Sequence, residues 1–227
     1  PWKKVGWVIP PEGNADFVAA MEKVLDVYRR PYDASRPVVC MDETPRQLIR
    51  ETKMPMPALP GRPERHDYEY ERCGVCNVFM ACEPLAGKRM TKVTERKTRS
   101  DWARFLQDIA GRYGGAEKIT LVMDNLSTHT PGALYGAFAP AEAKALWERF
   151  EFVYTPKHGS WLNMAEIELN VMIRQCLSRR VSTVQELAGS VLAWQSHRDQ
   201  LRAKVNWQFT TEDARIKLKR LYPTLLE

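Results

Sequence analysis

The chain has 227 residues, of which 44% are hydrophobic, and its 34 basic and 28 acidic side chains give a net charge of +6. This composition excludes the disordered classes and allows a sizeable core, in one large domain or two small ones. No apolar run approaches the roughly 20 residues that a membrane-spanning helix needs. The basic balance is a mild indication of a polyanionic partner.

The cysteines and the first residues of the chain give information about the cellular compartment. Five cysteines are an odd number in a chain too long to need disulfides, which favours reduced thiols. Cys73 and Cys76 have the spacing of a zinc pair, but no second pair closes a tetrahedral site, so with Cys82 we interpret them as strand thiols. The start, Pro-Trp-Lys-Lys, has no signal-peptide pattern and no initiator Met. We therefore expect a cytoplasmic domain cut from a longer protein, without membrane contact.

The first half of the chain predicts a helix, a strand, a long connection and a hairpin. Residues 14–29 repeat apolar side chains at spacings of three and four, which is typical of a helix. Residues 37–41 form a short apolar strand that leads into Asp42. Residues 44–66 are rich in proline and basic side chains, so we expect a connection that is either an exposed loop or a nucleic-acid contact. Two further strands and a helix follow, at residues 68–83, 89–95 and 100–113.

The second half begins with a short strand of a different kind. Residues 119–123 are a run of β-favouring apolar side chains, as in a strand buried on both faces, and Asp124 follows directly. The later elements are a short helix from Thr130, a helix at 141–150, a strand at 151–155, helices at 161–177 and 183–202, and a basic helix from Thr211.

Two strands therefore end in an acid, and a hairpin and a helix separate them. This order predicts a mixed sheet in which the two strands are parallel neighbours with Asp42 and Asp124 at one edge. Close carboxylates repel unless they share a cation or a proton, and oxygen ligands without a His or Cys set indicate Mg²⁺ or Mn²⁺. Glu166, on a mostly apolar helix face, is the candidate third acid. We expect Glu168 to be exposed, and Glu43 to point away from the cleft.

Three motifs resemble the DDE transposases of the mariner superfamily, in the branch carried by bacterial insertion sequences. They are Val-Cys-Met-Asp42-Glu, Val-Met-Asp124-Asn-Leu-Ser-Thr-His129 and Thr-Pro-Lys-His-Gly-Ser-Trp-Leu-Asn163-Met-Ala-Glu166. The resemblance covers about residues 3–200. It implies that Asp42, Asp124 and Glu166 are the catalytic, metal-binding triad. The flanking polar positions that it implies are Asn125, His129 and Asn163.

The same resemblance implies an α/β fold, an RNase H-like mixed five-stranded sheet flanked by helices. We expect a single domain over residues 1–227, with a core at about 36–180, a helical lead-in at 1–35 and C-terminal helices at 181–227. Such transposases usually carry an N-terminal helix-turn-helix region that recognises the transposon ends, and we expect it to be absent here. The gap between Asp124 and Glu166 is somewhat longer than the family usually shows.

The implied activity is phosphoryl transfer with two Mg²⁺ ions, for which Mn²⁺ can substitute. It cleaves a strand at the transposon end and then joins the freed 3′-hydroxyl to target DNA. The implied partners are double-stranded DNA and further copies of the chain, as a homodimer or larger assembly. We expect the protein in the cytoplasm of a bacterium, associated with the nucleoid.

Several residues keep two interpretations. His129 forms local hydrogen bonds or acts in catalysis, and Asn163 caps a helix or takes part in the site. His158 contacts DNA or lies in an exposed loop, while Arg174, Arg179 and Arg180 contact phosphate or are solvated. Two rival functions also remain, a nuclease that cleaves without joining and a non-catalytic DNA-binding remnant of a transposon. The intact acids argue against the remnant.

Overall fold

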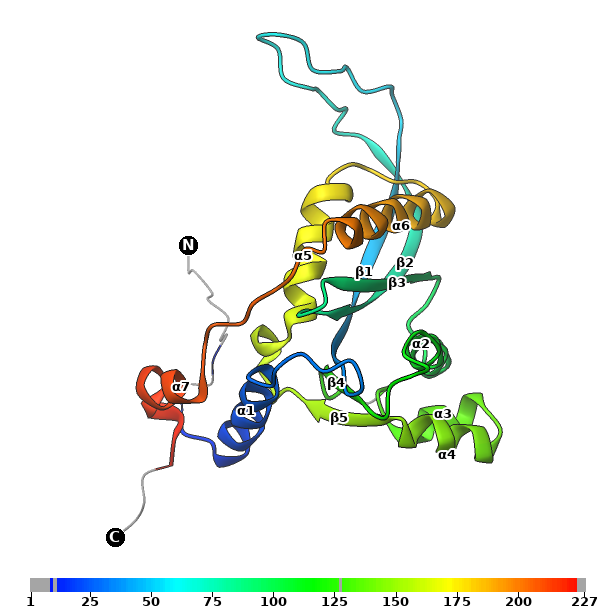
Figure 1. Cartoon of the computed structure of the whole chain (residues 1–227). Coiled ribbons are helices and arrows are strands. Elements are labelled where there is room, and N and C mark those ends of the chain that lie inside the picture. The colour runs from blue at the N-terminus through cyan, green and yellow to red at the C-terminus, as the bar shows by residue number, and fades with distance from the viewer. Residues whose placement is uncertain (1–8, 10–11, 127, 224–227) are drawn as a thin grey trace.

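In the computed structural model, which describes residues 9, 12–126 and 128–223, the chain is built around one mixed sheet (Figure 1). Its strands are β1 (Val38–Glu51), β2 (Tyr70–Glu83), β3 (Lys88–Thr94), β4 (Ile119–Met123) and β5 (Phe150–Tyr154), in the order β3-β2-β1-β4-β5. The β1–β2 and β2–β3 pairs are antiparallel, whereas β1–β4 and β4–β5 are parallel. The prediction that the two acid-bearing strands are parallel neighbours is confirmed. The expected first residues of the lead-in, 1–8 and 10–11, lie outside the described residues.

Helices cover both faces of this sheet. One face packs against α2 (Arg99–Arg112), α3 (Pro131–Ala137) and α4 (Pro140–Glu148), and the other against α1 (Ala15–Tyr28), α5 (Met164–Cys176) and α6 (Val184–Gln200), while α7 (Thr211–Lys217) packs on α1. Single 3-10 turns lie at Ser160–Leu162 and Lys219–Leu221. Strand alternation divides the core, because Val39 and Met41 pack toward α2 while Cys40 packs toward α1. The result is the α/β arrangement expected from the sequence.

Local sequence explains where these elements begin. All five side chains of β4 are buried, which is why its sequence is continuously apolar. The side chain of Asn14 accepts a hydrogen bond from the Phe17 amide at 2.9 Å and starts α1. Thr98 and Asp101 form a capping box at the start of α2. None of the helices that the structure describes is long and apolar enough to cross a membrane.

The expected connection at residues 44–66 is wrong over residues 44–51, which belong to a strand, whereas residues 52–66 do form a connection outside the sheet strands. Strand β1 continues through Asp42 to Glu51 and pairs with β2 along the whole way. Beyond it, residues 52–69 form a narrow arm that projects from the sheet, with bridges from Met56 to Arg65 and from Leu59 to Arg62 (Figure 1). Only Leu48 is buried in this outer part of β1, so the sequence there lacks the apolar run that identifies a covered strand.

Candidate active site

The parallel pairing of β1 with β4 brings Asp42 and Asp124 to the same place. The pairing ends at Cys40 and Val122, so Asp42 lies just past the last bridge, and Asp124 follows the last residue of β4. Ligand sites of α/β sheets lie at such carboxyl ends. The two acids therefore face a common space although a hairpin and a helix separate them in sequence.

Asn163 places Glu166 opposite this pair. Its Oδ1 accepts a hydrogen bond from the Ala165 amide at 3.1 Å, which caps α5, and its Nδ2 donates to the Met41 carbonyl at 2.8 Å. The same buried side chain thus starts the helix and fastens its first turn to the residue before Asp42. Glu166 lies in that first turn. The interpretation of Asn163 as a helix cap is confirmed, and the same side chain borders the cavity described next.

All three acids line one cavity of about 250 Å³, together with Glu43 and Asn163. Burial, followed by the charges of Asp124, Glu43 and Glu166, raises the pKa of Asp42 to about 7. Oε2 of Glu166 is buried and accepts no hydrogen bond from any residue that the structure describes. Among the described residues, no basic side chain pairs with Asp42 or Glu166, so these two acids face the cavity without a counter-charge.

His129 occupies the other side of Asp124, where it makes local contacts, as one of its two interpretations stated. The imidazole is buried and stacks on Trp102 with ring centroids 5.3 Å apart. Its Nδ1 lies 2.8 Å from Oδ1 of Asp124, and its Nε2 lies 3.5 Å from Oε2 of Glu43. Burial opposes protonation of the ring, but these two carboxylates outweigh it and raise the pKa of His129 to about 9. The imidazolium is thus a fixed counter-charge that orients Asp124.

Glu43 is not directed into solvent. Alternation turns it from the α5 side toward His129, and Lys97 Nζ lies 3.2 Å from its Oε1. Its side chain is only 2% exposed. Glu43 thus points away from the α5 side, as alternation predicts, but it is buried against two basic groups and still borders the cavity.

The donor set suits hard divalent cations. Carboxylate oxygens are the ligands that Mg²⁺ and Mn²⁺ prefer, and an unpartnered buried oxygen on Glu166 beside a carboxyl of raised pKa is what a cation would relieve. Within the described part of the chain, no three Asp, Glu, His or Cys side chains converge closely enough to enclose one ion. This arrangement suits ions that are each held by few carboxylates and completed by water and substrate oxygens, as is usual for Mg²⁺.

Glu168 contradicts the sequence prediction, because it is fully buried. Its two oxygens accept hydrogen bonds from Nε and Nη2 of Arg89 at 2.7 and 2.8 Å, and Arg198 donates to it at 2.9 Å. Arg89 also donates to the Gly87 and Ala203 carbonyls. Helical spacing alone cannot separate a solvated glutamate from one whose partner lies on a distant strand.

The arginines predicted to contact nucleic acid are engaged within the chain. Arg179 pairs with Glu186 at 2.6 Å, and Arg180 pairs with Glu51 at 2.6 Å while lying over the Tyr70 ring. Arg174 donates to the Asn170 carbonyl on its own helix. Asn125 and His158 lie instead beside a second cavity next to Asp124.

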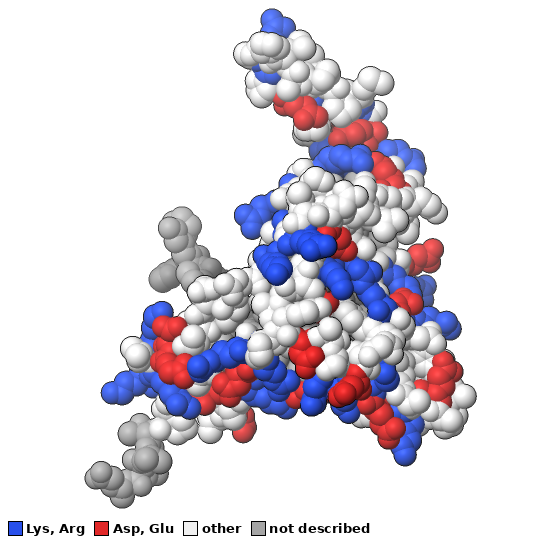
Figure 2. Space-filling model, viewed as in Figure 1, with Lys and Arg blue, Asp and Glu red and all other residues white. Residues whose placement is uncertain are grey.

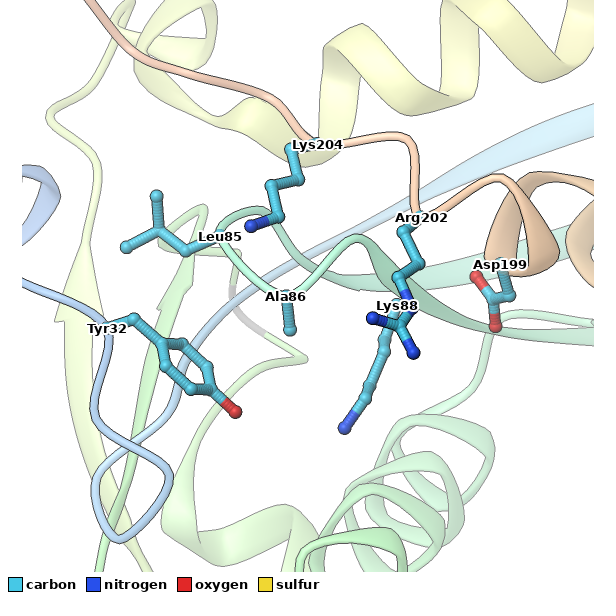
Figure 3. A pocket seen from close by; sticks show the side chains of 7 residues that line it. All are labelled: Tyr32, Leu85, Ala86, Lys88, Asp199, Arg202 and Lys204. Atoms are coloured by element: carbon cyan, nitrogen blue, oxygen red, sulfur yellow. The ribbon is translucent and has the colours of Figure 1, made fainter.

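A basic cavity elsewhere was not found by sequence reasoning. It measures about 370 Å³ and is lined by Tyr32, Lys88, Arg202 and Lys204 with Asp199 at one side (Figure 3). Among the described residues, these three cations form no ion pair. Basic and acidic side chains are mixed over the face of the molecule in Figure 2, with a basic group near its middle. Residues from three distant segments form the cavity, so no local motif signals it.

Comparison with known proteins gives a family and a fold. Residues 37–188 match the family model described as DDE superfamily endonuclease. Among curated proteins, none matches the chain. The solved structures that resemble it include the Mos1 strand transfer complex, with 15% identity and a TM-score of 0.59 over 89% of this chain and 61% of that one. The Mos1 mariner paired end complex with Mn has 16% identity and a TM-score of 0.53 over 89% and 62%.

A third solved structure, the mariner Mos1 paired end complex with Mg, has 13% identity and a TM-score of 0.56 over 99% of this chain and 68% of that one. At these identities the likeness concerns the fold, and it agrees with the mixed five-stranded sheet flanked by helices. The chain spans about three fifths of the length of the first Mos1 chains that it resembles.

Proposed function

The chain belongs to the DDE superfamily endonuclease family, and from that membership we propose that it is the catalytic domain of a transposase of the mariner superfamily, in the insertion-sequence branch of bacteria. Its reaction is divalent-metal-dependent cleavage of DNA at transposon ends followed by strand transfer. The observation that carries the proposal is one cavity lined by Asp42, Asp124 and Glu166, which come from three distant segments. The Mos1 structures with transposon ends, Mn and Mg support it by analogy.

The residues divide the work as follows. Asp42, Asp124 and Glu166 would hold two Mg²⁺ ions, or Mn²⁺ in their place. When bound, such ions activate the attacking oxygen and stabilise the leaving oxygen of an in-line displacement. His129 holds Asp124 in orientation from outside the cavity, and Asn163 fixes the first turn of α5 so that Glu166 stays opposite Asp42. Catalysis in this scheme depends on positioning by buried, rigid elements.

Double-stranded DNA is the proposed substrate, and a dimer or larger assembly on paired ends is the proposed working form, in the bacterial cytoplasm. A nuclease that cleaves without joining would share every residue of this cavity. Analysis of the products distinguishes the two functions, because only a transposase yields joints between the 3′ end and target DNA.

The test is strand cleavage of labelled transposon-end DNA in Mg²⁺ and in Mn²⁺, with Asp124→Asn and Glu166→Gln as variants. We expect each variant to keep its fold and to lose at least about 100-fold in rate, since each removes a carboxylate that would hold a metal ion. Cleavage that persists in folded Asp124→Asn would show that this cavity is not the active site.

A further inference from the structure

A second cavity lies next to the acids, beyond the carboxyl ends of β4 and β5. It measures about 550 Å³. Asn125, directly after Asp124, forms one wall, and residues 155–158 after β5 form another, facing Phe17 of α1. The Thr155 amide donates to the Met123 carbonyl at 2.9 Å and keeps the two strand ends side by side. A strand of DNA whose phosphate lies on the acids would reach this space with its neighbouring nucleotide.

The turn at the rim of this cavity holds His158 in an unusual conformation. Its φ is 64°, in the left-handed region that disfavours residues with a Cβ. The Gly159 amide donates to the Pro156 carbonyl at 2.8 Å and closes the turn, and a Cβ on Gly159 would lie 2.5 Å from Cγ of Pro156. Turns with a positive φ at their third position normally carry Gly or Asn there. Histidine enters this region more readily than most residues with a Cβ, and backbone strain of this kind clusters at binding and active sites, which directs attention to the cavity that His158 borders.

The lining favours a neutral ligand with hydrogen-bonding edges. The side chains of Asn125, Lys157 and His158 form no hydrogen bond with the residues that the structure describes. An asparagine amide both donates and accepts, as base edges require, and an imidazole can stack on a base. Asp16 on α1 faces the same space and balances the charge of Lys157, so the cavity does not suit an isolated phosphate.

We propose that this cavity is a nucleotide subsite, in which His158 and Asn125 bind the base and sugar of one unpaired nucleotide beside the phosphate held at the acids. The proposal rests on the proposed DNA-cleaving function and adds to it the residues that would sense the strand next to the cleavage point. Its volume lies within the range of sites that bind small organic ligands.

The test compares two labelled DNA duplexes, one blunt and one with a short single-stranded 3′ tail, by fluorescence anisotropy. Ca²⁺ replaces Mg²⁺, because its larger and more flexible coordination lets binding be measured apart from cleavage. We expect the full chain to prefer the tailed duplex, and His158→Gly and Asn125→Ala each to reduce that preference about 5–100-fold, the range of a lost base contact. The variant His158→Gly should unfold at the same or a higher temperature, since Gly accepts the turn without strain.

The matched control is His197→Asn, which removes an exposed histidine from α6, away from the cavity, and should leave the preference unchanged. The salt dependence of binding gives a further criterion. Loss of a neutral base contact leaves the slope against log salt unchanged, whereas loss of a phosphate contact lowers it by about one. An equal preference in wild type and His158→Gly, or a slope lowered by His158→Gly, overturns the subsite. Absence of metal-dependent cleavage by the wild type would instead overturn the proposed function.

Discussion

At the residue scale, the acids of the cavity depend on side chains that do not face substrate. His129 is enclosed by Asp124, Glu43 and Trp102, and it supplies the positive charge that stabilises the buried carboxylate of Glu43 and the partly buried one of Asp124 so close together. A residue in this position affects both folding and activity. Its two effects can be separated by measuring stability and cleavage on the same variants.

We predict that His129→Asn lowers the free energy of unfolding by on the order of 3 kcal/mol, because it leaves the buried Glu43 and its neighbour Asp124 without their shared cation. Urea denaturation measures this change. The double variant His129→Asn/Glu43→Gln should recover part of the loss, since it removes the uncompensated charge as well. Equal stability of the single and double variants would contradict the ion-pair explanation.

Sequence analysis selected the three acids that line the cavity, but it misjudged the surroundings of the neighbouring glutamates. Asp42, Asp124 and Glu166 each lie next to a local sequence pattern, an apolar strand or the start of a helix. Glu168 and Glu43 follow no such signal. Each is buried because it pairs with a basic residue from a distant part of the chain. Arg89 and Lys97 are those partners, and nothing in the local pattern announces either contact.

At the element scale, α5 is fastened to the sheet at both sides of Glu166. Asn163 binds the Met41 carbonyl before it, and Glu168 binds Arg89 of β3 after it. The helix therefore cannot rotate without breaking a buried ion pair. Periodicity identified this helix correctly, yet it gave no information about what fixes the rotation.

We predict that Glu168→Leu costs about 3–5 kcal/mol in the free energy of unfolding, because buried Arg89 loses the carboxylate that accepts two of its hydrogen bonds and keeps only Asp199, at 3.6 Å. The double variant Arg89→Met/Glu168→Leu replaces both charges by apolar groups and should be clearly more stable than Glu168→Leu alone. Chemical denaturation of the variants gives both values. A double variant no more stable than the single one would contradict the explanation that the loss comes from the uncompensated charge of Arg89.

The contact between α1 and α7 is sensitive to acid. The hydrogen bond from Arg215 holds the pKa of Glu22 below its usual value, against the opposing effect of burial, and Tyr222 donates to it as well. A carboxyl group whose pKa is lower in the folded than in the unfolded protein stabilises the fold. This contribution is complete at a pH above the unfolded-state pKa and is lost as the pH falls through the folded-state pKa. We predict that Glu22→Gln shows a smaller loss of thermal stability than wild type between neutral pH and about pH 3. Identical pH profiles would contradict a folded-state role for this carboxylate.

The outer half of β1 shows where element prediction reaches its limit. Apolar runs identify strands that both layers of helices cover, which holds for β4 and for the first residues of β1. Further along, the strand is covered less and carries Pro45, Arg46 and Gln47, and its register is set by pairing with β2. Cross-strand pairing involves residues far apart in sequence, so the local pattern resembles a loop.

At the scale of the whole molecule, topology was predictable because few arrangements join two parallel strands through a hairpin and a helix. The cavities were not, since each one combines side chains from segments that meet only in the folded chain. The basic cavity shows this clearly, because Lys88 follows the β2–β3 turn while Arg202 and Lys204 follow α6. The Val205 amide binds the Pro84 carbonyl at 3.1 Å and joins the two segments.

We predict that replacing Lys88, Arg202 and Lys204 together by Ala weakens binding to duplex DNA and lowers the slope of log affinity against log salt by about 2–3, because each cation that contacts a phosphate adds about 0.9 to it. The matched control removes three cations that already pair with acids, Arg29, Lys92 and Lys144. Both triple variants change the net charge equally, so a difference between their slopes measures contact and not overall attraction. If both variants lower the slope equally, the three cations of the cavity do not contact phosphates directly, and the chain attracts DNA only through its overall positive charge.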